Sequence, residues 1–183
     1  NFHKTFIPER GLIAEILEYA AKGKKGNYQG ISTETGIPMG KSSGKVPAIL
    51  AYASGMGLIE VFAEKGVKKP VLTPFGNIVY KKDKYLSENV VQWLAHMNLC
   101  RNDIGAKVWH AVFAMGRNII GSAFTREQLE EYLISLFGKC SRIIGPLVSA
   151  YQKDVGFKEG NILFQNGSEI FRNKAPISEL YSL

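Results

Sequence analysis

A stretch rich in glycine, serine and lysine, residues 40–45 (GKSSGK), contains the residue types that cradle a phosphate. A P-loop needs a glycine, four further residues, then Gly-Lys and a Ser or Thr that binds magnesium. Gly40-Lys41-Ser42 supplies that ending, but only three residues separate Gly36 from Gly40. The second Gly-Lys pair is followed by Val46, and the segment before the stretch is polar rather than a buried strand. These departures argue against a nucleotide-binding loop.

The sequence shows no recognised catalytic pattern. Asp154, Lys158 and Glu159 come nearest to the carboxylate–lysine cluster of a metal-dependent nuclease, but we interpret them as a helix end followed by an exposed loop. Ser42 lies in a Gly-x-Ser-x-Gly match (GKSSG, residues 40–44), but the polar segment before it is not the buried strand that precedes a nucleophile elbow. The histidines and cysteines lack zinc-ligand spacing, so we predict no structural zinc and two reduced, buried thiols. They are His3, His96, His110, Cys100 and Cys140.

The charge of the chain is unevenly distributed. The whole chain carries a net charge of +7, and residues 1–85 hold 13 Lys and Arg against 7 Asp and Glu. The remainder is nearly neutral, with 10 basic and 9 acidic residues. A basic half favours a polyanionic partner such as nucleic acid. No apolar run is long enough to span a membrane and no signal peptide is visible, so we expect a cytoplasmic protein with no membrane partner.

Residue patterns in the first half predict three helices, a strand pair and a fourth helix. The first helix has apolar positions at helical spacing, and a short second helix begins at Ser32 and ends at Gly36. Ser42 or Ser43 is expected to cap the third helix and Thr73 the fourth. The predicted order is helix 11–22, the short helix, helix 44–54, strand 58–63, turn 64–70, strand 71–73 and helix 74–80.

This order is the layout of a winged helix-turn-helix, with residues 41–54 as recognition helix and residues 64–70 as wing. Hydroxyls, lysines and free N–H groups at the start of a helix suit phosphate oxygens. GKSSGK is therefore interpreted as a DNA-contacting helix start rather than a nucleotide loop. The predicted DNA-binding residues are Lys41, Ser42, Ser43, Lys45, Lys65, Lys68, Lys69 and Arg10. The alternative is a winged helix used only for packing or protein contact, with its lysines solvated.

The second half is predicted to be helical. Val90, Trp93, Leu94 and Met97 share one face of an expected helix over residues 87–99, which Ser87 would cap. Further helices are predicted over residues 104–115, from the capping box at Thr125, and over 141–155, with a loop-like end after residue 156. We therefore predict a mainly α fold with a small β-hairpin wing. It comprises a winged helix-turn-helix domain (residues 1–85) and a helical domain (residues 86–183), which we expect to be truncated at its C-terminal end.

Several sequence blocks resemble the bacterial SspB-like family. Phe2 to Ile13 (FHKTFIPERGLI) matches an opening His-x-Thr-Phe segment with an arginine and a Gly-Trp-Leu-like triplet, here with Leu12 in place of the tryptophan. The blocks LTPFGNIVY and DKYLSENVVQWLAHMNL match later segments, and the resemblance covers residues 2 to about 115. It implies a component of a DNA phosphorothioation and phage-defence system that binds DNA and nicks it for sulfur insertion.

The resemblance also implies partners and a cofactor. The expected partners are DNA and the cysteine desulfurase, ATPase and PAPS-reductase-like proteins of the same system. The residues themselves identify no cofactor, and magnesium is expected if the protein nicks DNA. Two alternatives stay open. One is a non-catalytic winged-helix transcription regulator with a helical dimerisation domain, and the other is a scaffold whose basic half contacts a protein.

Overall fold

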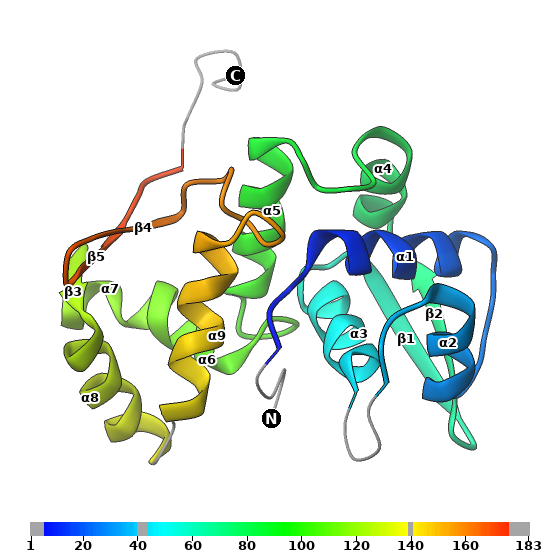
Figure 1. Ribbon diagram of the computed structural model, residues 1–183, viewed down its shortest axis with the longest axis horizontal. Helices are drawn as coiled ribbons and strands as arrows, with labels where there is room; N and C mark the ends of the chain where they lie inside the picture. Colours follow the sequence, from blue (N-terminus) through cyan, green and yellow to red (C-terminus); the bar gives the residue numbers. More distant parts are fainter. Residues whose placement is uncertain (1–5, 40–43, 139–140, 176–183) are drawn as a thin grey trace.

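The computed structural model describes residues 6–39, 44–138 and 141–175, and helices dominate its mixed α/β fold (Figure 1). The first half contains three helices, an antiparallel hairpin and a fourth helix. These elements are α1 (Arg10–Ala21), α2 (Tyr28–Thr35), α3 (Lys45–Gly55), β1 (Ile59–Glu64), β2 (Val67–Leu72) and α4 (Pro74–Lys82).

Local signals explain where these helices begin and end. Thr73 caps α4 as predicted, because its hydroxyl accepts a hydrogen bond from the Gly76 backbone N–H at 2.9 Å. Gly36 ends α2 in the left-handed conformation, as its lack of a Cβ permits. The predicted start of α2 at Ser32 is wrong. The Asn27 side chain accepts from Gly30 N at 2.7 Å and starts the helix one turn earlier.

The second half combines short helices with a second sheet. Its elements are α5 (Asn89–Leu99), α6 (Lys107–Trp109), the π-helix η1 (His110–Met115), α7 (Arg117–Ile120), β3 (Ala123–Thr125), α8 (Arg126–Phe137), α9 (Ser141–Gln152), β4 (Leu163–Asn166) and β5 (Glu169–Arg172). The three strands form an antiparallel sheet in the order β3-β5-β4. The predictions of one continuous helix over residues 104–115 and of a loop-like end are therefore wrong, whereas the capping box of Thr125 and Gln128 is confirmed.

The predicted cap and buried face of α5 are wrong. The helix begins after Glu88, and the Asp83 carboxylate accepts from the N–H groups of Ser87 and Glu88 at 2.8 and 2.9 Å. Trp93 is buried, but Val90, Leu94 and Met97 are 48%, 44% and 56% exposed. The buried positions of α5 include two polar residues, Gln92 and His96.

The two halves share one hydrophobic core. The rings of Tyr52 on α3 and Trp109 on α6 meet edge to face, with centroids 5.8 Å apart. The Asn98 side chain on α5 donates to the Met56 carbonyl oxygen at 3.0 Å. Burial raises the pKa of the free Cys100 thiol, while Cys140 lies outside the described residues. Within the part of the chain that the structure describes, no helix has the length and apolar character needed to cross a membrane.

Candidate nucleic-acid interface

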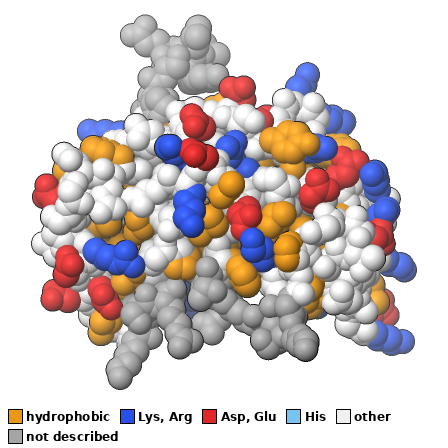
Figure 2. All heavy atoms as spheres, viewed as in Figure 1, with side chains coloured by type: hydrophobic (Ala, Val, Ile, Leu, Met, Phe, Trp, Pro, Cys, Tyr) orange, Lys and Arg blue, Asp and Glu red, His pale blue; other side chains and the backbone are white. Residues whose placement is uncertain are grey.

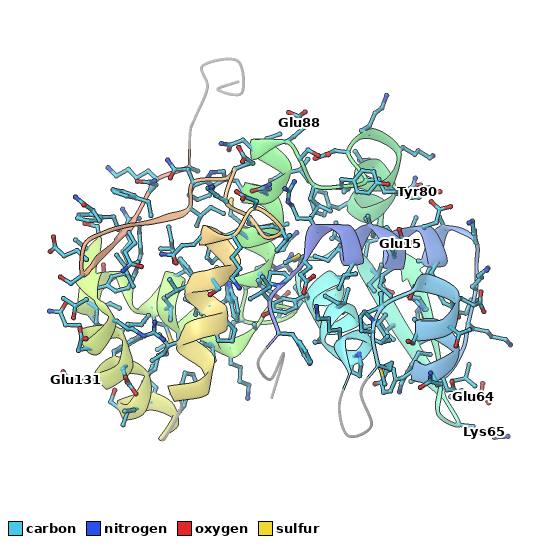
Figure 3. The ribbon with its side chains drawn as sticks, viewed as in Figure 1. Glu15, Glu64, Lys65, Tyr80, Glu88 and Glu131 are labelled. Carbon is cyan, nitrogen blue, oxygen red and sulfur yellow. The ribbon has the colours of Figure 1, made fainter. Side chains whose placement is uncertain are left out.

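The β1–β2 hairpin has a shorter turn than the sequence predicted. β1 and β2 pair along their whole lengths, from Ile59 with Leu72 to Glu64 with Val67, and leave only Lys65 and Gly66 in the turn. The predicted loop over residues 64–70 is thus mostly strand. Both turn residues have positive φ, +46° for Lys65 and +84° for Gly66, as a two-residue hairpin turn of type I′ requires. The turn holds the Lys65 side chain at the tip of the hairpin, pointing away from the molecule (Figure 3).

The connection between α1 and α2 lies beside the hairpin. Gly26 and Lys68 exchange two backbone hydrogen bonds, Gly26 N to Lys68 O at 3.0 Å and Lys68 N to Gly26 O at 2.8 Å. The Lys68 ammonium lies 5.7 Å from the centroid of the Tyr28 ring, which is 38% exposed. Lysine and arginine side chains gather along this side of the molecule, at the right of Figure 2.

Four lysines on this side have no ion pair with an acidic side chain among the described residues. We call them the basic edge: Lys25 from the α1–α2 connection, and Lys65, Lys68 and Lys69 from the hairpin. The sequence had marked the three hairpin lysines but not Lys25 or Tyr28. Residues 23–26 (GKKG) directly follow the predicted helix 11–22, and the backbone pairing of Gly26 with Lys68 is a tertiary contact that no local sequence pattern predicts.

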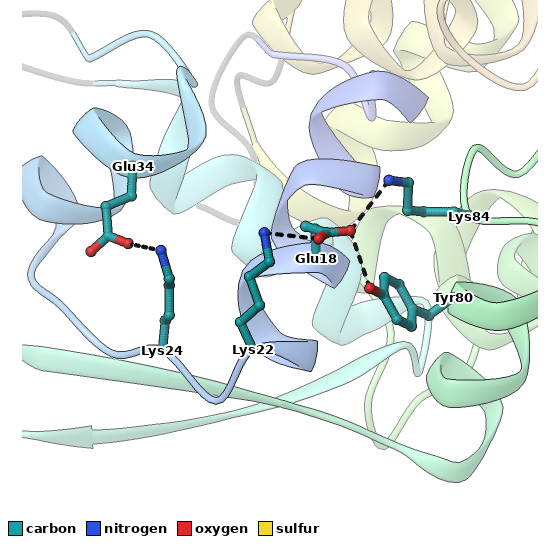
Figure 4. A network of polar contacts seen from close by, with 6 residues as sticks. All are labelled: Glu18, Lys22, Lys24, Glu34, Tyr80 and Lys84. Carbon is teal, nitrogen blue, oxygen red and sulfur yellow. Dashed lines mark hydrogen bonds and ion pairs between the residues drawn. The ribbon is translucent and has the colours of Figure 1, made fainter.

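Several other lysines of the basic half are paired with carboxylates (Figure 4). Glu18 on α1 binds Lys22 at 2.9 Å and Lys84 at 3.3 Å and accepts from the Tyr80 hydroxyl at 3.1 Å. The hydrogen bond from Lys22, followed by those from Lys84 and Tyr80, lowers the pKa of Glu18 to about 2. These pairs reduce the charge available to a ligand, so among the described lysines of the basic half the unpaired ones are those of the basic edge together with Lys81 and Lys82 on α4.

Lys24 and Lys45 are paired as well. Lys24 lies 2.5 Å from Glu34, and Lys45, in the first turn of α3, lies 2.5 Å from Glu9. The structure has Gly44 as the N-cap residue of α3. Lys41, Ser42 and Ser43 themselves lie outside the described residues.

The body of α3 is covered by its neighbours. Every residue from Lys45 to Gly55 is buried or half-buried, and α1, α2 and α5 all pack against the helix. A helix that enters the major groove must offer side chains to base edges along one free face. The first turn of α3 lies on the same side of the molecule as the hairpin turn (Figure 1).

Arg10 lies at the junction of the two halves. Its guanidinium donates to the carbonyl oxygens of Leu86 at 3.3 Å and Asp154 at 2.7 Å, and its backbone N–H donates to Val155 O at 2.8 Å. A shallow cavity of about 360 Å³ adjoins it, lined in part by Glu9 and Tyr85. These contacts join α1 to the segments that precede α5 and follow α9. The structure therefore does not bring Arg10 together with the basic edge.

No metal-binding cluster is formed by the described residues. Nowhere in residues 6–39, 44–138 and 141–175 do three His, Cys, Asp or Glu side chains come close enough to share an ion. Asp154, which the sequence placed nearest to a nuclease cluster, pairs with Lys158 at 2.7 Å on the surface.

These features define a mixed, mainly helical fold that displays a basic hairpin beside three packed helices. The chain belongs to the family described as "Protein of unknown function (DUF4007)", whose model matches residues 2–157. The fold is similar to a crystal structure of magnesium ion-bound SspB, with a TM-score of 0.71, which confirms the SspB-like resemblance at the level of the fold.

That similarity joins two distant sequences of unequal length. The two chains are 17% identical, and the match covers 96% of this chain and 60% of the other. This chain thus spans about 60% of the length of that SspB structure. Among curated proteins, no match was found.

Proposed function

We propose that this protein is a DNA-binding component of a bacterial DNA phosphorothioation and defence system, and that the basic edge contacts the DNA backbone. The observation that carries the proposal is the set of four lysines that have no acidic partner among the described residues and that the hairpin and its pairing with Gly26 hold on one side of the fold. The motif resemblance and the SspB-like fold support the choice of system.

The geometry favours contact with phosphates over reading of bases. Lysines that neutralise phosphates release condensed counterions, and this contribution to affinity does not depend on sequence. Tyr28, beside Lys68, adds an exposed aromatic face on which an unpaired base could stack. Because the body of α3 is covered, we propose that the first three helices and the hairpin act as a winged helix whose hairpin, rather than its helix, supplies most of the contact.

The other residues that the sequence predicted to bind DNA have different roles in this proposal. Lys45 would contribute once its pair with Glu9 opens, and Lys41, Ser42 and Ser43 precede it in sequence. Arg10 is assigned to holding the two halves together. We assign DNA nicking to none of the described residues, because they form no cluster that could bind a metal ion. The other proteins of such a system, including its desulfurase and ATPase, are the partners we expect.

Fluorescence anisotropy on a labelled duplex, titrated at several salt concentrations, tests this function. With four phosphate contacts the slope of log K against log salt is about −3.6, so affinity falls ~150-fold between ~50 and ~200 mM salt through the basic edge alone. The test variant replaces Lys25, Lys65, Lys68 and Lys69 with alanine, and it should lose most of this salt dependence.

The matched control removes the same charge elsewhere. It replaces four exposed lysines that lie outside the basic edge and form no ion pair among the described residues, namely Lys81, Lys82, Lys107 and Lys153. Equal affinity of the two variants would refute the basic edge as the contact surface. A wild-type protein that binds no duplex even at low salt would favour the scaffold alternative, and tight binding to one sequence alone would favour the transcription regulator.

A further inference from the structure

A second cationic feature lies in the other half of the molecule, away from the basic edge. A cavity of about 390 Å³ opens between α5, η1, α7 and the end of β5. Trp93 and Phe113 supply aromatic walls, and Arg117, Arg172 and Lys174 supply three cations. No carboxylate is among the described residues that line it. Its volume falls within the range of about 300–1,000 Å³ that is typical of small-molecule sites.

The buried hydrogen-bond donors of this cavity lack protein acceptors. The Arg172 guanidinium nitrogens Nε, Nη1 and Nη2 are all buried and have no hydrogen-bond partner among the described residues. Trp93 lines the same cavity, and its indole Nε1 is also buried without a hydrogen-bond partner among the described residues. Buried polar groups are almost always paired in folded proteins, and each exception calls for a bound partner or another explanation.

Aromatic rings do not satisfy these donors. The guanidinium carbon of Arg172 lies 4.8 Å from the centroid of Phe124 and 5.9 Å from that of Phe113. A ring face attracts the positive charge, but the guanidinium N–H bonds point outward in its own plane and need acceptors there. The arrangement leaves a planar fork of donors, the group that binds a phosphate or carboxylate through two parallel hydrogen bonds.

The charge of Arg172 is also uncompensated. Burial, assisted by the positive charge of Arg117, lowers the pKa of Arg172 to about 10. His96, deeper in the same wall, cannot add or balance charge because burial lowers its pKa to about 3 and keeps the ring neutral. The surrounding side chains thus favour an anion.

The backbone at this place is irregular as well. Phe113 comes from η1, a π-helical segment of six residues, and π-helical turns occur frequently at functional sites. The wider turn follows the short helix α6, and Trp109 on α6 donates a hydrogen bond to the Tyr151 hydroxyl at 2.7 Å. That hydroxyl also lies 2.6 Å from His96 Nδ1, so a buried network holds the wall of the cavity in place.

We propose that this cavity binds a small organic oxyanion with a flat ring, of the class of a nucleoside monophosphate. The phosphate would accept from the Arg172 fork, with Arg117 and Lys174 adding charge at the entrance, where both side chains are exposed. The ring would lie against the aromatic wall that contains Trp93. The inference goes beyond DNA binding by the basic edge and does not depend on it.

Isothermal titration calorimetry of the whole protein with AMP, inorganic phosphate and adenosine tests the proposal. AMP should bind saturably and more tightly than either part alone. Loss of hydrogen bonds to a charged group weakens binding about tenfold to a hundredfold, and we expect that loss in Arg172→Met. Arg126→Met is the matched control, because Arg126 is an exposed arginine of the same half that does not line the cavity.

Two further variants keep the test decisive if Arg172→Met does not fold. The double variant Arg117→Met/Lys174→Met changes only exposed side chains and should still weaken AMP binding. Arg172→Lys keeps the positive charge but lacks the fork of donors, and it should bind AMP more weakly than the wild type. Absence of saturable binding up to ~10 mM AMP, or unchanged affinity in these variants, would overturn the site. If adenosine bound as tightly as AMP, the phosphate group would contribute nothing and the proposed oxyanion site would be refuted. If inorganic phosphate bound as tightly as AMP, the proposed contact between the ring and the aromatic wall would be refuted. Arg172→Met should retain full affinity for duplex DNA.

Discussion

Lys65 is expected to lower the free energy of unfolding while it places a positive charge at the tip of the hairpin. Its φ of +46° places a side-chain-bearing residue in the left-handed region, which costs roughly 1–2 kcal/mol that glycine does not incur. Lys65→Gly removes this cost but adds about 0.5–1 kcal/mol of chain entropy to the unfolded state. We therefore expect the free energy of unfolding to rise by about 0.5–1 kcal/mol.

The same substitution should weaken DNA binding. If Lys65 contacts one phosphate, its loss reduces the slope of log K against log salt by ~0.9. Between ~50 and ~200 mM salt, the factor by which the variant loses affinity should then be about 3.5 times smaller than the factor for the wild type. Stability and binding thus move in opposite directions, as expected for a strained residue that is retained for function.

Urea unfolding, followed by circular dichroism, measures the first effect. The midpoint should rise by a few tenths of a molar with an unchanged m-value. Lys65→Gln separates strain from charge, because it keeps the left-handed side chain and removes the ammonium group. It should bind DNA like Lys65→Gly and unfold like the wild type. A Lys65→Gly protein no more stable than Lys65→Gln would refute the strain argument.

Three more perturbations have expected outcomes. The folded-state pKa of Glu18 is lowered to about 2, so the stability it contributes is complete above its ordinary pKa of 4.5 and is lost as the pH falls toward 2; Glu18→Gln should flatten acid unfolding curves across that window. Tyr151→Phe removes the hydroxyl bonded to His96 and should lower the free energy of unfolding by about 1–3 kcal/mol in urea titrations. Gly76→Ala would place a Cβ 1.8 Å from the Leu58 carbonyl oxygen, so its thermal midpoint should fall sharply, or soluble protein should be lost.

Two threonine caps located helix starts correctly, whereas the helix starts predicted at Ser32 and Ser87 were wrong. Thr73 and Thr125 mark the starts of α4 and α8 because each hydroxyl bonds a backbone N–H within its own helical turn, so the signal is entirely local. The start of α5 was misplaced because the bonds that would suit a Ser87 cap are made to Asp83 instead. Leu86, with φ +50°, bends the chain between them, and that conformation is invisible in the residue pattern.

Both sheets were under-predicted for physical reasons that differ. Pro70 and two lysines made the second hairpin strand look like a loop, yet a two-stranded sheet has only edge strands, where proline is tolerated. In the C-terminal sheet, β4 and β5 are only four residues long, and β5 also pairs with β3 some 45 residues earlier. The accessible charge of the basic edge was equally non-local, since it depends on which lysines find carboxylates.

The orientation of α5 shows why apolar spacing alone gave the wrong face. Gln92 is fully buried because its amide donates to Leu86 O at 2.8 Å and its oxygen accepts from Gly160 N at 2.7 Å. His96 is buried because it meets the Tyr151 hydroxyl. Once paired, these polar groups no longer carry the desolvation cost that places Gln and His outside in a hydropathy argument. They rotate the helix so that Trp93 reaches the cationic cavity while Val90, Leu94 and Met97 face outward. The polar residues of α5 therefore position the wall of the proposed anion site.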